Sequence, residues 1–94
     1  MEDLFEWGEK KARSNLRDHG VSFDEAQTVF NDDFSITIPD PGHSFGEERF
    51  LIIGVSHTDR LLVVVFTERD DRIRLISARE AERHERRDYE EGII

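Results

Sequence analysis

The stretch LLVVVFT, residues 61–67, decides the fold of this chain. It is an unbroken run of apolar and β-branched residues, and side chains of these kinds favour extended backbone. A strand that is apolar on both faces is covered on both faces. We therefore expect residues 61–67 to form the central strand of a sheet, with the more polar segments of the chain packed around it.

Three further strands are expected beside the central one, and residues 4–7 read as a short β-like start to the chain. The segments 34–38, 49–55 and 72–78 are short, rich in β-forming residues and bounded by turn residues. Residues 57–60 and 68–71 read as the turns between successive strands. Strands joined by such short connections pair antiparallel. The sequence therefore predicts a four-stranded antiparallel meander.

Three helices are expected around this meander. Residues 9–19 carry apolar residues at helical spacing. Ser22 and Glu25 have the spacing of a capping box for a second helix, which should fade over 31–33. The charged segment 80–91 reads as the third. Two N-terminal helices, four strands and a C-terminal helix predict a single α+β domain over residues 1–94, with the helices on one face of the sheet.

Composition narrows the class of protein. Cysteine is absent, so neither a disulfide nor a thiolate site is expected. The first residues lack the pattern of a signal peptide, and no apolar run is long enough to cross a membrane. We therefore expect a soluble, cytoplasmic protein that does not bind membranes.

Positive charge is unevenly distributed along the chain. The net charge is −9, which argues against a general nucleic-acid binder. Residues 69–87 nevertheless hold seven arginines against five acidic residues, a net of +2. Local charge decides where a phosphate can bind, so this segment is the first place to look for a site.

Arg69 and Arg79 are the leading candidates for a phosphate site. Each lies at the end of an expected strand, where functional residues are often placed. The planar guanidinium matches a phosphate and stays charged, and two of them could hold a scissile phosphate and stabilise its developing charge. The alternative is that both form surface ion pairs with Asp70, Asp71 or Glu80.

Glu68 and His19 are the candidate acid–base residues. Histidine titrates near neutrality and suits proton transfer. In the last turn of a helix it also has a structural explanation, because its charge complements the helix dipole. Glu68 follows the central strand and has a comparable alternative, an ion pair with Arg69.

Four further residues are candidates for RNA contacts. Lys11 lies in the first helix, and Arg72 and Arg74 share one face of the last strand. Tyr89 could stack on a base or pack the last helix onto the sheet. No metal or cofactor is expected, because the loop residues Asp40, His43 and Glu47 match no compact ligand motif.

Taken in order along the chain, these residues resemble the signature of the BrnT family of toxins. The matching positions are Phe5-Glu6-Trp7, Lys11-Ala12, Asn15, His19 to Phe23, Glu48-Arg49, Gly54, Leu61 to Val65, Thr67 to Arg69, Arg74 to Arg79, Glu85 to Arg87 and Tyr89. Two positions depart from the family pattern. Gly8 stands where an acidic residue is usual, and Asp18 where a lysine is usual.

The resemblance implies a type II toxin with a RelE-like fold that cleaves RNA and arrests translation. It also implies a BrnA-like antitoxin partner, through which any contact with DNA would be made. Carried over by position, Arg69 and Arg79 would be catalytic, with Lys11 and His19 as further candidates. The expected reaction is metal-independent attack by the RNA 2′-hydroxyl, with Glu68 or His19 as the base.

Two other functions remain open at this level. The arginine-rich half could belong to a non-catalytic module that binds an acidic partner. A DNA-binding regulator is disfavoured, because we identify no helix with a sustained basic face.

Overall fold

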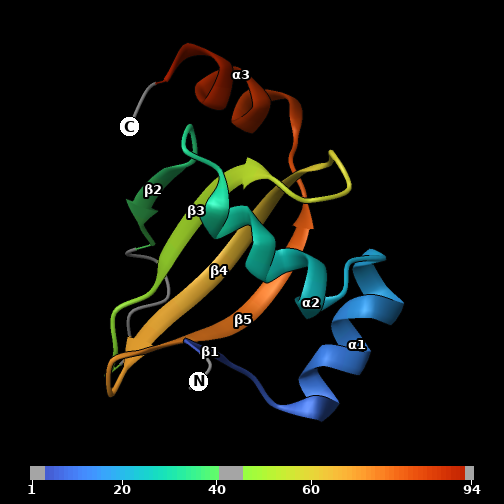
Figure 1. Ribbon diagram of the computed structural model, residues 1–94, viewed down its shortest axis with the longest axis vertical. Coiled ribbons are helices and arrows are strands. Elements are labelled where there is room, and N and C mark those ends of the chain that lie inside the picture. The colour runs from blue at the N-terminus through green and yellow to red at the C-terminus, as the bar shows by residue number, and fades with distance from the viewer. Residues whose placement is uncertain (1–3, 41–45, 93–94) are drawn as a thin grey trace.

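The central strand is where the apolar run predicts it, in the middle of a sheet. The computed structural model describes residues 4–40 and 46–92 (Figure 1). The elements are β1 (Phe5–Glu6), α1 (Glu9–His19), α2 (Phe23–Ala26), the 3₁₀ helix η1 (Gln27–Asn31), β2 (Ile36–Pro39), β3 (Phe50–Val55), β4 (Leu61–Arg69), β5 (Arg72–Glu80) and α3 (Arg83–Glu91). None of the described helices combines the length and apolar character that crossing a bilayer requires.

The sheet has five strands in the order β1-β5-β4-β3-β2. Strands β2 to β5 form the predicted antiparallel meander. The prediction of a purely antiparallel, four-stranded sheet is wrong, because β1 adds a fifth strand parallel to β5. Phe5 pairs with Ile73 and Glu6 with Arg74. The sequence indicates a β-like start at residues 4–7, but a segment this short has no periodicity that reveals its pairing partner.

The main core lies between the sheet and the helices α2 and η1. In Figure 1 these two helices cross the front of the sheet, while α1 flanks β5 and α3 lies at the top. Leu62, Val64 and Phe66 point from β4 toward this core, which we call the helix face of the sheet. Phe30 of η1 makes edge contacts with Phe5 and Phe66, each at 5.0 Å between ring centroids. These contacts fix the short N-terminal strand against the core.

The opposite face of the sheet carries a smaller apolar cluster at one end. Leu61 and Val63 of β4 are buried there with Ile36 and Ile53, and Tyr89 of α3 packs against them. The prediction that all helices lie on one face of the sheet is therefore wrong, because α3 packs on this second cluster. The remainder of this face is formed by β4 and β5 and bears the residues considered below.

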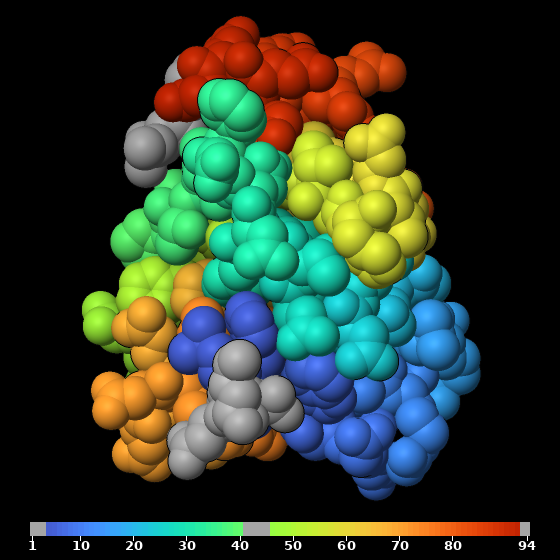
Figure 2. All heavy atoms as spheres, in the orientation of Figure 1, coloured from blue at the N-terminus to red at the C-terminus, as the bar shows by residue number. Residues whose placement is uncertain are grey.

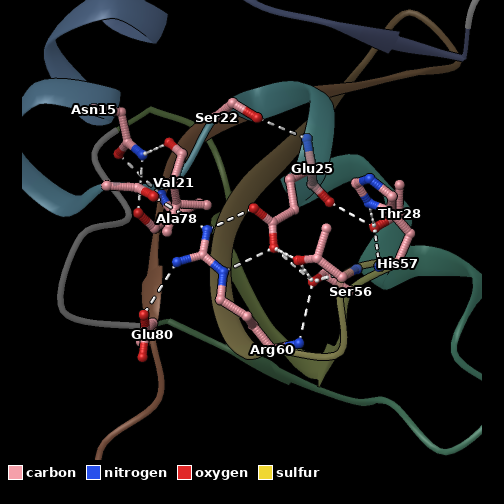
Figure 3. A network of polar contacts seen from close by, with 12 residues as sticks. Asn15, Val21, Ser22, Glu25, Thr28, Ser56, His57, Arg60, Ala78 and Glu80 are labelled. Atoms are coloured by element: carbon pink, nitrogen blue, oxygen red, sulfur yellow. Dashed lines mark hydrogen bonds and ion pairs between the residues drawn. The ribbon is translucent and has the colours of Figure 1, made fainter.

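The second helix is shorter than predicted and continues as a 3₁₀ helix. Ser22 caps it as expected, its hydroxyl accepting a bond from the Glu25 N–H at 3.0 Å. The Glu25 carboxylate does not complete the capping box. It turns instead toward the β3–β4 turn, where it accepts a bond from Arg60 Nε at 2.9 Å and from the hydroxyls of Ser56 and Thr58 (Figure 3).

β4 and β5 are each two residues longer than predicted, and β4 gains its two residues on the side of the turn. Asp70 and Asp71 both have positive φ, 53° and 66°. This is the backbone of a two-residue hairpin turn whose twist matches that of the flanking strands. The strands therefore pair up to Arg69 and Arg72. β5 also continues to Glu80, so α3 begins at Arg83 rather than at residue 80.

Candidate active site

A bulge in β5 decides which side chains share a face. Ser77 pairs with Val65 and Leu75 with the next residue, Phe66, so Ile76 has no partner on β4. Side chains alternate along a strand, and an extra residue reverses the alternation beyond it. Arg79 consequently shares a face with Arg74, although strict alternation would separate them.

Four arginines lie on this face, opposite to α2 and η1. Arg69 pairs with Arg72 across the hairpin, Arg74 pairs with Thr67, and Arg79 pairs with Val63. All of their β4 partners alternate with the core residues of the helix face. We call this surface, defined by Arg69, Arg72, Arg74 and Arg79, the arginine face.

Three of these arginines form weak, half-exposed ion pairs. Arg69 lies 3.4 Å from Glu47, Arg72 lies 3.7 Å from Glu6, and Arg74 lies 3.3 Å from the same Glu6. Their side chains are 49%, 39% and 36% exposed. Exposed pairs of this kind contribute little to stability, so an incoming phosphate can take the place of the carboxylate.

Arg79 is held far more firmly. Its Nη1 and Nη2 donate to the two carboxylate oxygens of Glu85 at 2.8 and 2.7 Å. Glu85 is buried and also accepts a bond from the Glu82 N–H. The Glu85 carboxylate raises the pKa of Arg79, and the guanidinium in turn lowers the pKa of Glu85. Among the described residues the Arg79 Nε–H has no partner, so this fixed guanidinium keeps a donor free.

A groove between α1 and β5 adjoins the arginine face. Asn15 fastens the helix to the strand: it donates to the carbonyls of Val21 and Ala78, both at 2.9 Å, and accepts from the Ala78 N–H at 3.0 Å. Lys11 and His19 stand one helical turn on either side of Asn15. Both line the groove.

The other groove residues are Ser14, Asn15, Asp18, Ile76 and Ser77. Ser77 lies on the arginine face, two residues before Arg79, which corresponds to roughly 7 Å along the strand. The structure thus brings Lys11 and His19 into one groove, and Arg79 follows its lining residue Ser77 by two positions on β5. Asp18, the departure noted in the sequence, contributes a carboxylate to the same groove.

Arg69 and Arg79 are not brought together. They lie at opposite ends of the β4–β5 hairpin, separated by roughly 20 Å along the strand. They share a face but lie too far apart to bind the same phosphate. The expectation that Arg69 and Arg79 together hold the scissile phosphate is therefore wrong. Glu68 pairs with Ile73 on the helix face, so it lies away from Arg79 as well.

Tyr89 has the packing role that the sequence left as an alternative to RNA contact. Its ring lies in the second apolar cluster, and its hydroxyl donates to Asp32 Oδ2 at 2.7 Å. Burial, reinforced by this bond to Asp32, raises the pKa of Tyr89 to about 12. A ring and a hydroxyl committed in this way are not free to bind RNA, which corrects the expectation.

No metal site emerges from the described residues. Ligand atoms of Glu82, His84 and Glu85 lie within 4.8 Å of one another. Both oxygens of Glu85 are already bonded to Arg79. His43, part of the loop set considered from the sequence, lies outside the described residues.

Sequence reasoning missed Glu6, Glu47 and Glu85 as the carboxylates that pair with the arginines. Glu85 has a local signal, because Glu82 and Glu85 have the spacing of a capping box, which the structure contains. Glu6 has none, since its position beside Arg74 depends on the parallel pairing of β1.

Comparisons with known proteins identify the family and the fold. The model of a family described as "ribonuclease toxin, BrnT, of type II toxin-antitoxin system" matches residues 7–85. The crystal structure of the ribonuclease toxin BrnT from Brucella abortus is similar, with a TM-score of 0.66 over 86% of this chain and 100% of that chain. The two sequences are 20% identical, so this likeness shows a shared fold. No curated protein matches the sequence.

Proposed function

Because the chain belongs to the BrnT family of ribonuclease toxins from type II toxin–antitoxin systems, we propose that it is a metal-independent endoribonuclease that arrests translation. One observation supports this site above others. The β5 bulge places Arg79 on the same face as Arg69, Arg72 and Arg74, next to a groove lined by Lys11 and His19. Such a surface offers both phosphate contacts and a group able to move a proton.

The proposed reaction is attack by the RNA 2′-hydroxyl on the adjacent phosphate. His19 accepts the hydroxyl proton, and the 2′ oxygen bonds to phosphorus. The bond to the 5′ oxygen breaks, and that oxygen takes a proton from solvent. Arg79 stabilises the charge that builds on the phosphate, and Lys11 contacts the same phosphate. The products carry a 2′,3′-cyclic phosphate and a 5′-hydroxyl.

His19 is a better candidate base than Glu68, because Glu68 lies on the other face of the sheet. Arg69, Arg72 and Arg74 lie too far along the hairpin to contact the phosphate that Arg79 contacts. In this proposal they bind neighbouring phosphates and position the strand. Their exposed ion pairs with Glu6 and Glu47 are exchanged for the RNA.

Cleavage of a labelled RNA by the purified protein tests the proposal. Arg79→Lys retains a charge beside Glu85 but loses the planar fork, so we expect a rate at least about 100-fold lower. Arg86→Lys, on the exposed surface of α3, is the matched control and should cleave at the wild-type rate. Equal rates for both variants would show that the site is wrong, and loss of wild-type cleavage in EDTA would exclude the metal-free mechanism.

Family membership implies an antitoxin partner. We propose a BrnA-like antitoxin that covers the arginine face and makes any contact with DNA on behalf of the complex. The rival function, a binding module without catalysis, predicts no toxicity. Expression without antitoxin should halt growth for the wild type and not for Arg79→Lys. Unimpaired growth with the folded wild-type protein would favour the binding module.

A further inference from the structure

The outer surface of α1 carries a cationic stripe. Lys10, Arg13, Ser14 and Arg17 follow one another at the spacing i, i+3, i+4, i+7, which places them along one face of a helix. The three charged side chains are exposed, and in Figure 2 α1 forms the blue edge of the molecule. Together with Gly8 and Lys11 they line a shallow hollow. We call the three charged residues the α1 stripe.

The α1 stripe lies on a helix with a net positive charge. Helix α1 contains four lysines and arginines against two acidic residues, whereas α2 and α3 each contain more acids than bases, and η1 contains neither. Lys10 and Arg13 have no ion pair among the described residues. Arg17 pairs with Asp18, but both side chains are mostly exposed. Every arginine of the arginine face, in contrast, has a carboxylate partner.

The stripe adjoins the arginine face at Gly8. This glycine lines the hollow beside the stripe, and a Cβ placed on it would lie 3.8 Å from Nη2 of Arg74. No side chain therefore stands between Arg74 and the start of α1. The two positive surfaces can contact one continuous strand.

The residues that line the hollow suit the phosphates of a nucleic-acid backbone better than a protein partner. Its lining residues are charged, small or polar, and none is a large apolar residue. Protein interfaces depend on buried aromatic or apolar anchors, which the stripe lacks. Binding to a nucleic-acid backbone needs only exposed cations at regular intervals.

We infer that the α1 stripe is a second RNA-binding surface, which holds the phosphates of the strand that flanks the cleaved bond. The inference rests on the proposed ribonuclease function and extends it, because it assigns substrate affinity to residues that take no part in bond cleavage. Helix α1 thus has two sides: Lys11 and His19 line the proposed catalytic groove, and Lys10, Arg13 and Arg17 hold RNA outside it.

Fluorescence anisotropy with a single-stranded 2′-O-methyl RNA, which lacks the attacking hydroxyl, measures binding separately from cleavage. The test variant is Lys10→Gln/Arg13→Gln/Arg17→Gln. The matched control, Arg83→Gln/Arg86→Gln/Arg87→Gln, removes the same charge from exposed positions on α3. We expect the test variant to flatten the slope of log affinity against log salt by about 2, at roughly 0.7 per lost phosphate contact, and the control to leave it within error.

The same variants then cleave an unmodified RNA. The α1 variant should raise KM several-fold and leave kcat within about twofold, because the stripe binds substrate and transition state alike. Equal losses of affinity in the α1 and α3 variants would overturn the inference, since net charge alone would explain them. Unchanged RNA affinity with lost antitoxin binding would also overturn it, in favour of a protein partner.

Failure of the inference and failure of the proposed function give different results. A wild type that binds the 2′-O-methyl RNA through α1 but cleaves no RNA upholds the stripe and rejects the nuclease. A wild type that cleaves RNA with a KM insensitive to the α1 variant upholds the nuclease and rejects the stripe. A wild type that binds no RNA rejects both.

Discussion

Gly54 lies where β3 passes beneath η1, at a point with no room for a side chain. A Cβ there would lie 2.9 Å from Val29 Cγ1, 3.0 Å from the Ser35 Cβ and 3.2 Å from Asp32 Oδ2. Asp32 cannot withdraw without loss, because the same oxygen accepts bonds from the Val55 N–H and the Tyr89 hydroxyl. The absence of a side chain at Gly54 thus allows β3, η1 and α3 to pack together.

We predict that Gly54→Ala destabilises the protein by about 1–3 kcal/mol, the usual cost of overpacking a close-packed interior. Gly8→Ala is the matched control, because its Cβ meets nothing closer than 3.8 Å and its backbone suits any residue. It should change stability by less than about 0.5 kcal/mol. Urea unfolding measures both, and equal midpoints for the two variants would contradict the predicted close contact.

The candidate site was predictable in part at the residue scale. Strand alternation correctly placed Arg72 and Arg74 on one face. Nothing local in the sequence announces the bulge at Ile76, and without it Arg79 would be assigned to the opposite face. Bulges depend on pairing between strands, so the arginine face as a whole could be recognised only in the folded chain.

At the scale of elements, one polar network ties α2 to the β3–β4 turn. Glu25 of α2 accepts bonds from Arg60 and from the hydroxyls of Ser56 and Thr58 (Figure 3). Arg60 also donates to Glu80 and to the carbonyl of Gly20. The network joins the end of α1, the start of α2 and the end of β5. It links α2 and the end of α1 to the sheet, and α1 is the helix that flanks the proposed groove.

This network predicts a pH dependence of stability. The bond from Arg60, with those from Ser56 and Thr58, lowers the pKa of Glu25 from 4.5 to about 2. A carboxylate whose pKa is lower in the folded protein stabilises the fold at pH values above its pKa in the unfolded chain. This stabilisation is lost as the pH falls from about 5 toward 2. Glu25→Gln should therefore be destabilised by roughly 2–3 kcal/mol at pH 7, and the difference from wild type should shrink near pH 2. Urea unfolding across this range checks it.

A difference between wild type and Glu25→Gln that stayed constant from pH 7 to pH 2.5 would contradict this assignment. The variant Asp24→Asn is a suitable control, because Asp24 neighbours Glu25 on α2 but is exposed. Its stability should follow the wild-type curve.

Element order was the most predictable part of the fold. Strong apolar runs and turn residues located β3, β4 and β5 to within a few residues. The β-like start of the chain was predicted, but its parallel pairing with β5 and the change of the second helix into η1 were not. The pairing depends on tertiary structure, because it joins Phe5 to Ile73.

At the scale of the whole molecule, folding redistributes the charge that the sequence displays. The segment 69–87 is net positive along the chain. In the fold four of its arginines pair with carboxylates that come from distant segments, such as Glu6 and Glu47, or from a buried helix position, Glu85. The exposed cations of α1 are left without such partners. The proposed RNA path therefore joins the arginine face, which the sequence indicates, to the α1 stripe, which it does not.

The RNA termini left by the purified wild-type protein in EDTA distinguish metal-free cleavage from the alternatives. Attack by the 2′-hydroxyl without a metal predicts fragments that end in a 2′,3′-cyclic phosphate, with 5′-hydroxyl groups on the downstream pieces. Fragments that end in a 3′-hydroxyl, or intact RNA after prolonged incubation with folded protein, would contradict the account.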